Sequence, residues 1–264
     1  MTPPDAVDVV IVNHNTRQDV LACLASLFAA PPASLGRVFV VDNASTDGSA
    51  AAIRSAWPRV EVLTLDRNAG FGAANNVALR QAASALVLIL NPDTIVPAGA
   101  VDALAARLAA TGATAAGPRL VDASGRPEIS FGSMLSPWTE LVQSIRVKLA
   151  ARDAGFSRAY IRGLVSRERI VDWVSGACLL VRREAALAAG LFDERYFLYE
   201  EDVDLCAALR ASGGRVLFTP AAEVVHLRGR SKGDPTHYDR SHLAFYAKHA
   251  PHWVPLLRLW QKLG

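Results

Sequence analysis

Four polar clusters in the sequence carry side chains that could act on a phosphorylated ligand. The first is Asn91-Pro92-Asp93, which directly follows an apolar run. A carboxylate at the end of a buried strand could bind Mg²⁺ or Mn²⁺, because these ions prefer oxygen ligands and often take one or two carboxylates beside phosphates and water. Taken alone, the motif is better interpreted as a turn, since Asn, Pro and Asp are common turn residues.

The second cluster places four acids within five residues, Glu200-Glu201-Asp202-Val203-Asp204, after the aromatic-rich segment 192–197. Acids are favoured at helix N-termini, so a solvated helix start is one interpretation. In an apolar setting, however, crowded carboxylates repel one another and at least one pKa rises. A carboxylate with a raised pKa is a better general base for a hydroxyl group.

The third and fourth clusters could contact phosphate or sugar. His226 precedes a small basic loop, Leu-Arg-Gly-Arg-Ser, which fits a diphosphate and metal site, although a lone histidine is more often structural. Segment 68–76 (NAGFGAANN) holds two glycines ahead of a predicted helix, which suits close approach to a nucleotide. It does not match the dinucleotide fingerprint, because Asn75 stands where the third glycine belongs.

The elements that position these clusters alternate between strands and helices. Strands are predicted at residues 7–12, 38–41, 60–65 and 86–90, and helices at 19–29, from about 48 to 56, at 73–83 and at 97–110. This rhythm predicts a mostly parallel sheet covered by helices on both faces. Polar residues follow every one of these strands, at the sheet edge where α/β proteins bind their ligands.

The second half of the chain is less regular. Residues 117–137 are predicted to form turns and short extended pieces. Further extended segments are predicted at 171–181, 216–218 and 223–227, the last two around a turn at Pro220. Residues 138–152 are predicted to form a helix with apolar residues at 138, 141, 142, 145 and 149, and with Arg146, Lys148 and Arg152 off this stripe. The stripe is narrow enough to pack on the sheet, and a basic helix that lies in a membrane interface is the less favoured alternative.

The C-terminal stretch 238–263 interleaves Trp and Leu with Lys and Arg. Such a composition is typical of a helix that lies in a membrane interface. An equally favoured alternative is that this stretch forms a helix that packs on the sheet and keeps its charged side chains in water. From His226 onward there are seven Lys and Arg against two Asp, a local excess that could face phosphates or an anionic membrane.

Composition limits the classes of function. With 264 residues, of which 51% are hydrophobic, the chain suits one large α/β domain with a C-terminal elaboration. A net charge of +3 is too small to suggest a protein that binds nucleic acid over much of its surface.

The cysteines indicate a reducing compartment. There are three of them (Cys23, Cys178 and Cys206) and no CxxC pair, which predicts free thiols, the second and third in the core, and a reduced, cytoplasmic compartment. With neither a signal-peptide pattern nor a spanning run, any membrane contact is expected to be peripheral.

Together and in this order, the clusters resemble glycosyltransferase family 2, in its rhamnosyltransferase-like branch. The matching segments are VVIVNHNT (9–16), VVDNASTDGS (40–49), RNAGFGAANN (67–76), LILNPDT (88–94) and residues 175–226, which include SGACLLVRREAALAAGLFDERYFLYEEDVDL. The resemblance implies a GT-A nucleotide-sugar-binding fold over residues 1–231, followed by a helical extension over 232–264. It also implies an inverting sugar transfer from a nucleoside diphosphate.

The resemblance assigns roles to individual positions. The implied donor-binding residues are Asn13, Asn15, Asp42, Arg67, Asn68, Gly70 and Asn91. Asp93 corresponds to the metal-binding acid of the DxD-type motif, with Mg²⁺ or Mn²⁺ as cofactor, and His226 completes the metal or diphosphate site. Because Asn91 replaces the first acid of that motif, the site has one charge fewer. Asp202 corresponds to the general base, and its neighbour Glu201 is the alternative.

The resemblance favours dTDP-L-rhamnose as donor, with UDP- and GDP-sugars as alternatives, and a glycan or lipid-linked saccharide as acceptor. Nucleic acid is not an expected partner, and the oligomeric state stays open, a homodimer included. A single base with in-line attack gives inversion without a carboxylate nucleophile. A non-catalytic nucleotide-sugar-binding module is the first rival, but it has no need of both Asp93 and Asp202. A nucleotidyltransferase is the second, but it would carry an early Gly- and Lys-rich phosphate loop, and none is present.

Overall fold

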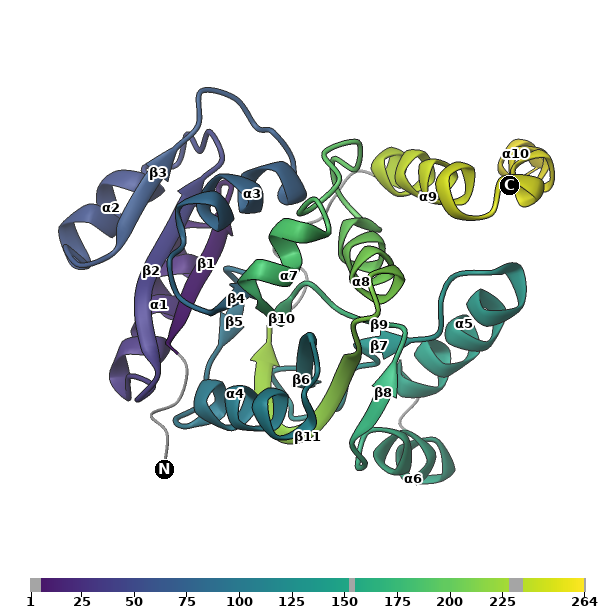
Figure 1. Ribbon diagram of the computed structural model, residues 1–264, viewed down its shortest axis with the longest axis horizontal. Coiled ribbons are helices and arrows are strands. Elements are labelled where there is room, and N and C mark those ends of the chain that lie inside the picture. The colour runs from purple at the N-terminus through teal and green to yellow at the C-terminus, as the bar shows by residue number, and fades with distance from the viewer. Residues whose placement is uncertain (1–5, 152–154, 228–234, 264) are drawn as a thin grey trace.

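A computed structural model describes residues 6–151, 155–227 and 235–263 as a sheet covered by helices (Figure 1). Nine strands form the main sheet in the order β3-β2-β1-β4-β10-β6-β11-β5, with β8 beside β11. The strands of this sheet are β1 (Val7–Asn13), β2 (Leu35–Asp42), β3 (Glu61–Thr64), β4 (Leu86–Leu90), β5 (Thr94–Ile95), β6 (Ala115–Val121), β8 (Arg169–Val171), β10 (Cys178–Arg182) and β11 (Val216–His226). A second, two-stranded sheet pairs β7 (Phe131–Gly132) with β9 (Trp173–Val174).

The helices bury apolar side chains on both faces of the main sheet. They are α1 (Arg17–Ala29), α2 (Ser49–Ala56), α3 (Phe71–Gln81), α4 (Ala100–Thr111), α5 (Pro137–Ala151), α6 (Gly155–Leu164), α7 (Arg183–Ala188), α8 (Glu201–Ala211), α9 (Pro235–His249) and α10 (Val254–Leu263), with a short 3₁₀ turn at Pro251–Trp253. Side chains of α1, α2 and α4 share one core cluster with alternate strand residues, and those of α3, α7 and α8 share the other. Because successive strand residues point to opposite faces, a strand covered on both faces must be apolar throughout, as β4 is.

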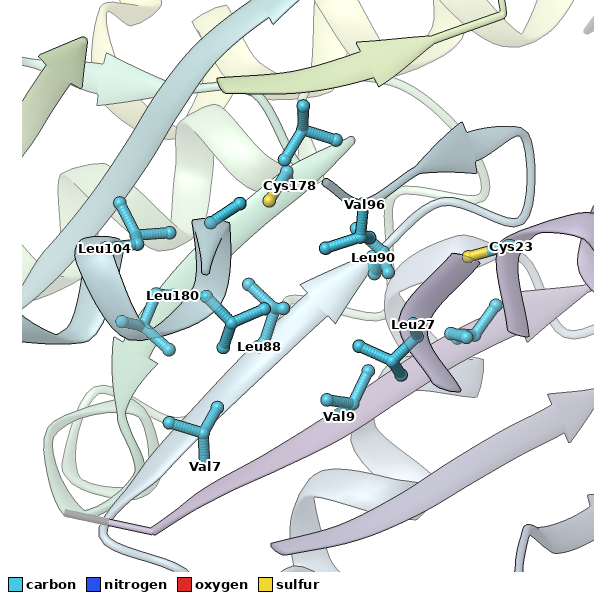
Figure 2. Packing of buried hydrophobic residues seen from close by; sticks show 14 of the residues in the cluster. Val7, Val9, Cys23, Leu27, Leu88, Leu90, Val96, Leu104, Cys178 and Leu180 are labelled. Carbon is cyan, nitrogen blue, oxygen red and sulfur yellow. The ribbon is translucent and has the colours of Figure 1, made fainter. Parts of the chain in front are cut away.

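The first core cluster shows how the strand ends are held in place. Figure 2 shows Leu88 and Leu90 of β4 between Leu27 of α1 and Leu104 of α4, with Val9 of β1 alongside. All five side chains are essentially inaccessible to solvent. Apolar burial of this extent fixes the register of the central strands, so the polar residues that follow them converge on one edge of the sheet.

The predicted α/β sheet with flanking helices is confirmed, but its parallel pairing is limited. Strands β3, β2, β1 and β4 run parallel, as do β6 and β11. Strand β10 runs antiparallel to both β4 and β6, so the sheet is mixed beyond β4. Alternating apolar residues indicate a strand but not the direction of its neighbour, which is why the sequence did not show this reversal.

Several predicted boundaries were wrong. Residues 115–121, expected to lie partly among turns, form the regular strand β6, and residues 171–181 divide into the end of β8, all of β9 and most of β10. Residues 216–226 form one strand, because a register shift between Thr219 and Glu223 accommodates Pro220 without ending the pairing. Helix α4 begins three residues after Pro97, because Gly99 adopts a left-handed conformation with φ of 75°.

The C-terminal helix α9 packs on the main body of the protein. The buried Phe245 and Tyr246 of α9 share a small core with Tyr196 and Val203. Ser241 donates a hydrogen bond to the carbonyl of Leu198 at 2.8 Å. The expected domain boundary at residue 231 lies outside the described residues. In the described parts of the chain, no helix is both long enough and apolar enough to cross a bilayer.

Helix α5 corrects part of the expectation that its apolar stripe packs on the sheet, because Leu149 packs against the second core cluster but three other residues of the stripe do not. Trp138, Leu141 and Ile145 face solvent, with exposed fractions of 71%, 52% and 50%. The helix instead turns Glu140 and Gln143 toward the body of the protein, where they bond Tyr246 and the carbonyl of Phe131. The stripe predicted the helix correctly, but it does not identify the face that is buried.

Candidate active site

The site lies where the central strands end, and its first part joins β1 to β2. The buried Asn13 donates hydrogen bonds to Asp42 Oδ1 at 2.9 Å and to Ser45 Oγ at 3.0 Å. The backbone N–H of Ser45 in turn donates to the second carboxylate oxygen of Asp42. Two predicted donor-binding residues are therefore brought together, and they hold each other in a fixed orientation at the edge of the sheet.

Asn43 links this edge to the glycine-containing loop and was not among the predicted site residues. Its amide group donates to Asn68 Oδ1 at 2.8 Å and to the carbonyl of Gly70 at 3.3 Å. Its amide oxygen accepts the backbone N–H of Ala69 at 2.8 Å. Asn68 is thus positioned by a side chain from the neighbouring strand end. The position of Asn43 directly after Asp42 is the sequence signal that could have revealed it.

Gly70 is required by a close backbone approach. Its φ of 88° and ψ of 170° are accessible essentially to glycine alone. A Cβ atom here would lie 2.3 Å from the carbonyl oxygen of Phe197, and that oxygen accepts the N–H of Phe71 at 2.9 Å. The sequence suggested that this glycine makes room for a nucleotide. In the structure it makes room for the loop that leads into the acid cluster.

Two other predicted donor-binding residues lie at the surface. Arg67 is exposed and forms no hydrogen bond or ion pair with the described part of the chain. Its guanidinium group therefore needs no existing contact to be broken before it binds an anion. Asn15 is also exposed, with φ of 55°, and its side chain accepts the backbone N–H of Thr46 at 2.7 Å.

Asp93 and His226, the predicted metal ligands, lie in contact. Asp93 Oδ1 is 3.3 Å from His226 Nε2, and His226 Nδ1 is 3.2 Å from Glu128 Oε2. Asp93 Oδ1 is buried and receives no hydrogen bond from the described residues. Burial alone would lower the pKa of His226, but the carboxylates of Asp93 and Glu128 outweigh it and raise this pKa to about 9. Glu128 was missed because it lies in an irregular segment about a hundred positions away from its partner.

The residues present fit a divalent ion that is held partly by its ligand. Asp93 Oδ1 is buried and contacts His226 Nε2 at 3.3 Å without a well-formed hydrogen bond, so it remains a suitable oxygen ligand for Mg²⁺ or Mn²⁺. Within the described residues, no three His, Cys, Asp or Glu side chains form a group that could hold a metal by themselves. Asp93, together with His226 once the ion displaces the imidazole proton, would therefore need phosphate oxygens and water to complete the coordination.

A short turn joins Asp93 and its motif to the acid cluster. Asp202 Oδ2 accepts the backbone N–H of Gly176 at 2.7 Å. The next carbonyl, that of Ala177, accepts the N–H of Asn91 at 3.0 Å. Two motifs separated by more than a hundred residues thus share one turn before β10. The structure therefore places Asp202 and the Asn91–Asp93 motif beside the same turn.

Glu201 and Asp202 differ in how readily they lose a proton. Burial, followed by the charge of Asp202, raises the pKa of Glu201 well above its usual value, and its Oε2 atom has no hydrogen-bond partner in the described structure. Burial also raises the pKa of Asp202, but the N–H groups of Gly176 and Val203 stabilise its charged form. The N–H groups of Gly176 and Val203 thus favour the charged form of Asp202, and no such donor reaches Glu201 Oε2 in the described structure.

Behind the acids lies a buried ion cluster that the sequence did not predict. Tyr199 and Glu200 both have positive φ values, 72° and 64°, at the turn that begins α8. Non-glycine residues in this region store strain of roughly 1–3 kcal/mol each, so surrounding contacts must hold them. His242 of α9 lies 3.2 Å from Glu200 and 3.4 Å from Glu140 of α5. No local pattern links these three positions, because they come from three separate helix regions.

The three cysteines meet the expectation for them. Cys23, Cys178 and Cys206 are free and buried. Burial raises the pKa of the Cys23 and Cys206 thiols to about 12, so they carry little of the reactive thiolate at neutral pH. The thiols belong to the core and are not candidates for nucleophiles.

A comparison with known families matches residues 8–185, more than half of the chain, to the model described as Glycosyl transferase family 2. The chain belongs to glycosyl transferase family 2. This glycosyltransferase is 32% identical to the N-acetylglucosaminyl-diphospho-decaprenol L-rhamnosyltransferase of Mycobacterium tuberculosis, over 96% of this chain and 88% of that protein. It is also 30% identical to the O-antigen biosynthesis protein RfbC of Myxococcus xanthus, over 93% of this chain and 19% of that protein. The match to the Mycobacterium tuberculosis protein supports the rhamnosyltransferase-like branch.

Solved structures confirm the GT-A fold of the glycosyltransferase. The structure of GalNAc-T7 with UDP, GalNAc and Mn²⁺ superposes with a TM-score of 0.67 at 16% identity, over 94% of this chain and 48% of that one. The mannosyltransferase PcManGT of Pyrobaculum calidifontis, in complex with GDP-Man and Mn²⁺, gives a TM-score of 0.62 at 21% identity, over 97% of this chain and 69% of that one. At these identities the likeness concerns the fold alone.

Proposed function

We propose that this glycosyltransferase transfers L-rhamnose from dTDP-L-rhamnose to a hydroxyl group of a lipid-linked saccharide, with inversion at the anomeric carbon. The observation that carries the proposal is the shared turn at Gly176 and Ala177, which bonds the base Asp202 on one side and the Asn91 motif on the other. The name of the Mycobacterium tuberculosis relative supports the choice of sugar and of a lipid diphosphate acceptor.

In this proposal Asp202 acts as the base. Its carboxylate takes the proton of the acceptor hydroxyl as that oxygen attacks the anomeric carbon. The new carbon–oxygen bond forms while the bond from that carbon to the diphosphate breaks, and dTDP leaves on the opposite side. One base and one in-line displacement invert the anomeric carbon without a covalent intermediate.

The leaving diphosphate would be bound on the side of the shared turn that holds Asp93. A divalent ion held by Asp93 and His226 would supply positive charge to the phosphates. The nearby Asn13–Asp42 pair is already rigid through its 2.9 Å hydrogen bond, so binding a nucleobase or ribose there costs little further ordering. The exposed Arg67 is the cation available for the phosphates from the loop after β3.

The donor can be identified by thermal shift with dTDP, UDP and GDP, each with and without Mn²⁺. Ligand binding to the native state raises its stability by mass action, so dTDP with Mn²⁺ should give the largest shift. Transfer from dTDP-L-rhamnose to a lipid-linked N-acetylglucosamine diphosphate should then be measurable. Equal shifts for all three nucleotides, or transfer from another donor alone, would overturn the choice of rhamnose.

The metal role is tested by Asp93→Asn. We expect this variant to lose most transfer activity and the Mn²⁺-dependent part of the thermal shift. The matched control is Glu184→Gln, which removes an exposed carboxylate on α7 and should change neither. Undiminished transfer in excess EDTA, or by Asp93→Asn, would remove the metal from the mechanism. The rival nucleotidyltransferase predicts pyrophosphate release from a nucleoside triphosphate, which the same preparations can be tested for.

A further inference from the structure

Glu128 and His226 meet because neighbouring strands carry them. Strands β6, β11 and β5 lie in this order in the main sheet. His226 is the last residue of β11 and is paired with Thr94 of β5, the residue directly after Asp93. On its other side β11 is paired with β6, whose last residue leads into the segment that carries Glu128. The sheet therefore places His226 between the strand that follows Asp93 and the strand that precedes Glu128.

A tight turn after β6 brings Glu128 back beside that strand. The Asp122 side chain closes the turn by accepting the backbone N–H groups of Ser124 and Arg126 at 2.8 and 2.9 Å. The backbone N–H of Glu128 then donates to the carbonyl of Leu120 in β6 at 2.9 Å. The backbone of Glu128 is thus attached to the main sheet, which gives its side chain a defined position.

His226 contacts its two carboxylate neighbours unequally. Its Nδ1 atom lies 3.2 Å from Glu128 Oε2 in hydrogen-bond geometry. Its Nε2 atom lies 3.3 Å from Asp93 Oδ1, but that oxygen forms no hydrogen bond with the described residues. All three side chains are shielded from solvent, with exposed fractions between 4% and 13%. The ring is therefore aligned by Glu128, whereas Nε2 and Asp93 Oδ1 lie side by side without being bonded to each other.

This alignment decides which nitrogen of His226 can bind a metal ion. The hydrogen bond made by one ring nitrogen sets which of the two keeps a proton. An ionised carboxylate accepts hydrogen bonds and cannot donate them, so Glu128 keeps a proton on Nδ1. The lone pair of Nε2, next to Asp93, is then the one that a metal ion can use after displacing its proton. Histidine ligands of metal ions are commonly oriented in this way by a carboxylate on the other nitrogen.

Glu128 acts on the site through the ring of His226. Within the described residues, no three His, Cys, Asp or Glu side chains form a group that could hold a metal ion, so Glu128 does not join Asp93 and His226 as a third ligand. Its contact is with Nδ1, and the two nitrogens of an imidazole direct their bonds away from each other. The carboxylate can therefore turn and hold the ring without touching the ion.

From these contacts we infer that Glu128 is a positioning residue, which holds the His226 ring with Nε2 toward Asp93 and so raises the affinity of the site for Mg²⁺ or Mn²⁺. The inference rests on the proposed function, because it concerns the metal role given there to Asp93 and His226. The family resemblance assigned no role to Glu128, and its place in an irregular segment gives no sequence signal for one.

The test compares Glu128→Gln with Glu128→Met in the full-length protein. Both replacements are close to glutamate in length and both are uncharged, so they change the charge beside His226 equally. The glutamine side chain retains an oxygen that can accept the Nδ1 proton, whereas the methionine sulfur is only a weak acceptor. Mn²⁺ binding is measured from the electron paramagnetic resonance signal of the free ion, with Mn²⁺ alone and with dTDP. Glu128→Gln should bind Mn²⁺ on the order of tenfold more tightly than Glu128→Met.

The same two variants are then compared in combination with His226→Gln. Because Glu128 is inferred to act through the ring, the difference between the two variants should fall to less than about twofold once the ring is absent. A difference that persists without His226 would mean that the side chain at position 128 contacts the ion or supports the fold directly, and would overturn the inference. So would equal Mn²⁺ affinities of the two variants in the protein that retains His226.

Glu223→Gln is the matched control. It removes a partly exposed carboxylate from the same strand as His226, and Glu223 pairs with Arg119 instead. This variant should bind Mn²⁺ like the wild type, and circular dichroism checks the fold of every variant.

The outcomes separate this inference from the proposed function. A wild type that binds Mn²⁺, with equal affinities in Glu128→Gln and Glu128→Met, would refute the inference and leave the proposed metal role intact. A wild type that binds no Mn²⁺, alone or with dTDP, would remove the metal role and the inference together. If dTDP adds nothing to the binding, the comparison with Mn²⁺ alone still decides the inference, and only the choice of donor falls.

Discussion

The substitution His242→Gln tests how α9 supports the turn before the catalytic acids. The His242 side chain is almost fully buried, with Nδ1 3.2 Å from Glu200 Oε1 and Nε2 3.4 Å from Glu140 Oε2. Burial lowers the pKa of a histidine, but these two carboxylates outweigh burial and raise the pKa of His242 to about 9. Glutamine retains a hydrogen-bond donor, yet it cannot carry the positive charge that both carboxylates contact.

The size of the effect follows from the shift in pKa. A rise from 6.5 to about 9 corresponds to an upper bound of about 3 kcal/mol in the free energy of unfolding. Glu140 is partly exposed, and solvent screening brings the expectation to about 2 kcal/mol. Because the native state binds the proton more tightly than the unfolded chain, this stabilisation is fully present below the unfolded pKa near 6.5. It is lost as the pH rises through about 9.

The assay is urea unfolding of the wild type and of His242→Gln at several pH values from 6 to 10. The wild type should be more stable by about 2 kcal/mol at pH 6, and the difference should shrink to a few tenths above pH 9.5. His252→Gln, at an exposed histidine of the following 3₁₀ turn, is the matched control and should match the wild type throughout. A stability difference that is the same at pH 6 and pH 10 would refute the ion cluster as its source.

Three further predictions concern the site and the core. Asp202→Asn should retain the dTDP-induced thermal shift but lose on the order of 10²–10⁴ in kcat, the usual contribution of a general base, whereas Glu201→Gln should lose less; the opposite order would exchange their roles. Gly70→Ala should lower the free energy of unfolding by at least about 1–3 kcal/mol, because its Cβ meets the Phe197 carbonyl at 2.3 Å and its φ is 88°; unchanged urea unfolding would contradict the close approach. Replacing all three buried thiols (Cys23, Cys178 and Cys206) by alanine or serine should leave transfer measurable, and a folded but inactive triple variant would show that a thiol takes part.

The sequence by itself was sufficient to predict where the central strands lie and which polar residues follow them. Strand β4 coincides with the predicted residues 86–90, and the helices of the first half were located to within a few residues. The reason is local: continuous apolar runs and helical spacing act over a few positions. In parallel strands, the residues after each run must also meet at one edge, so Asn13, Asp42 and Asp93 could be grouped before any contact was known.

Only the tertiary structure decided which groups became partners across the chain. Glu128 beside His226, and Glu140 and His242 around Glu200, depend on how distant segments pack, and no short pattern records that. The same limit explains α5, whose stripe at 138, 141 and 145 predicts a helix equally well whether that face meets a core or solvent. Local periodicity determines the secondary structure of a segment. The element that covers its apolar face is chosen by long-range packing, where many weak contacts compete across the whole fold.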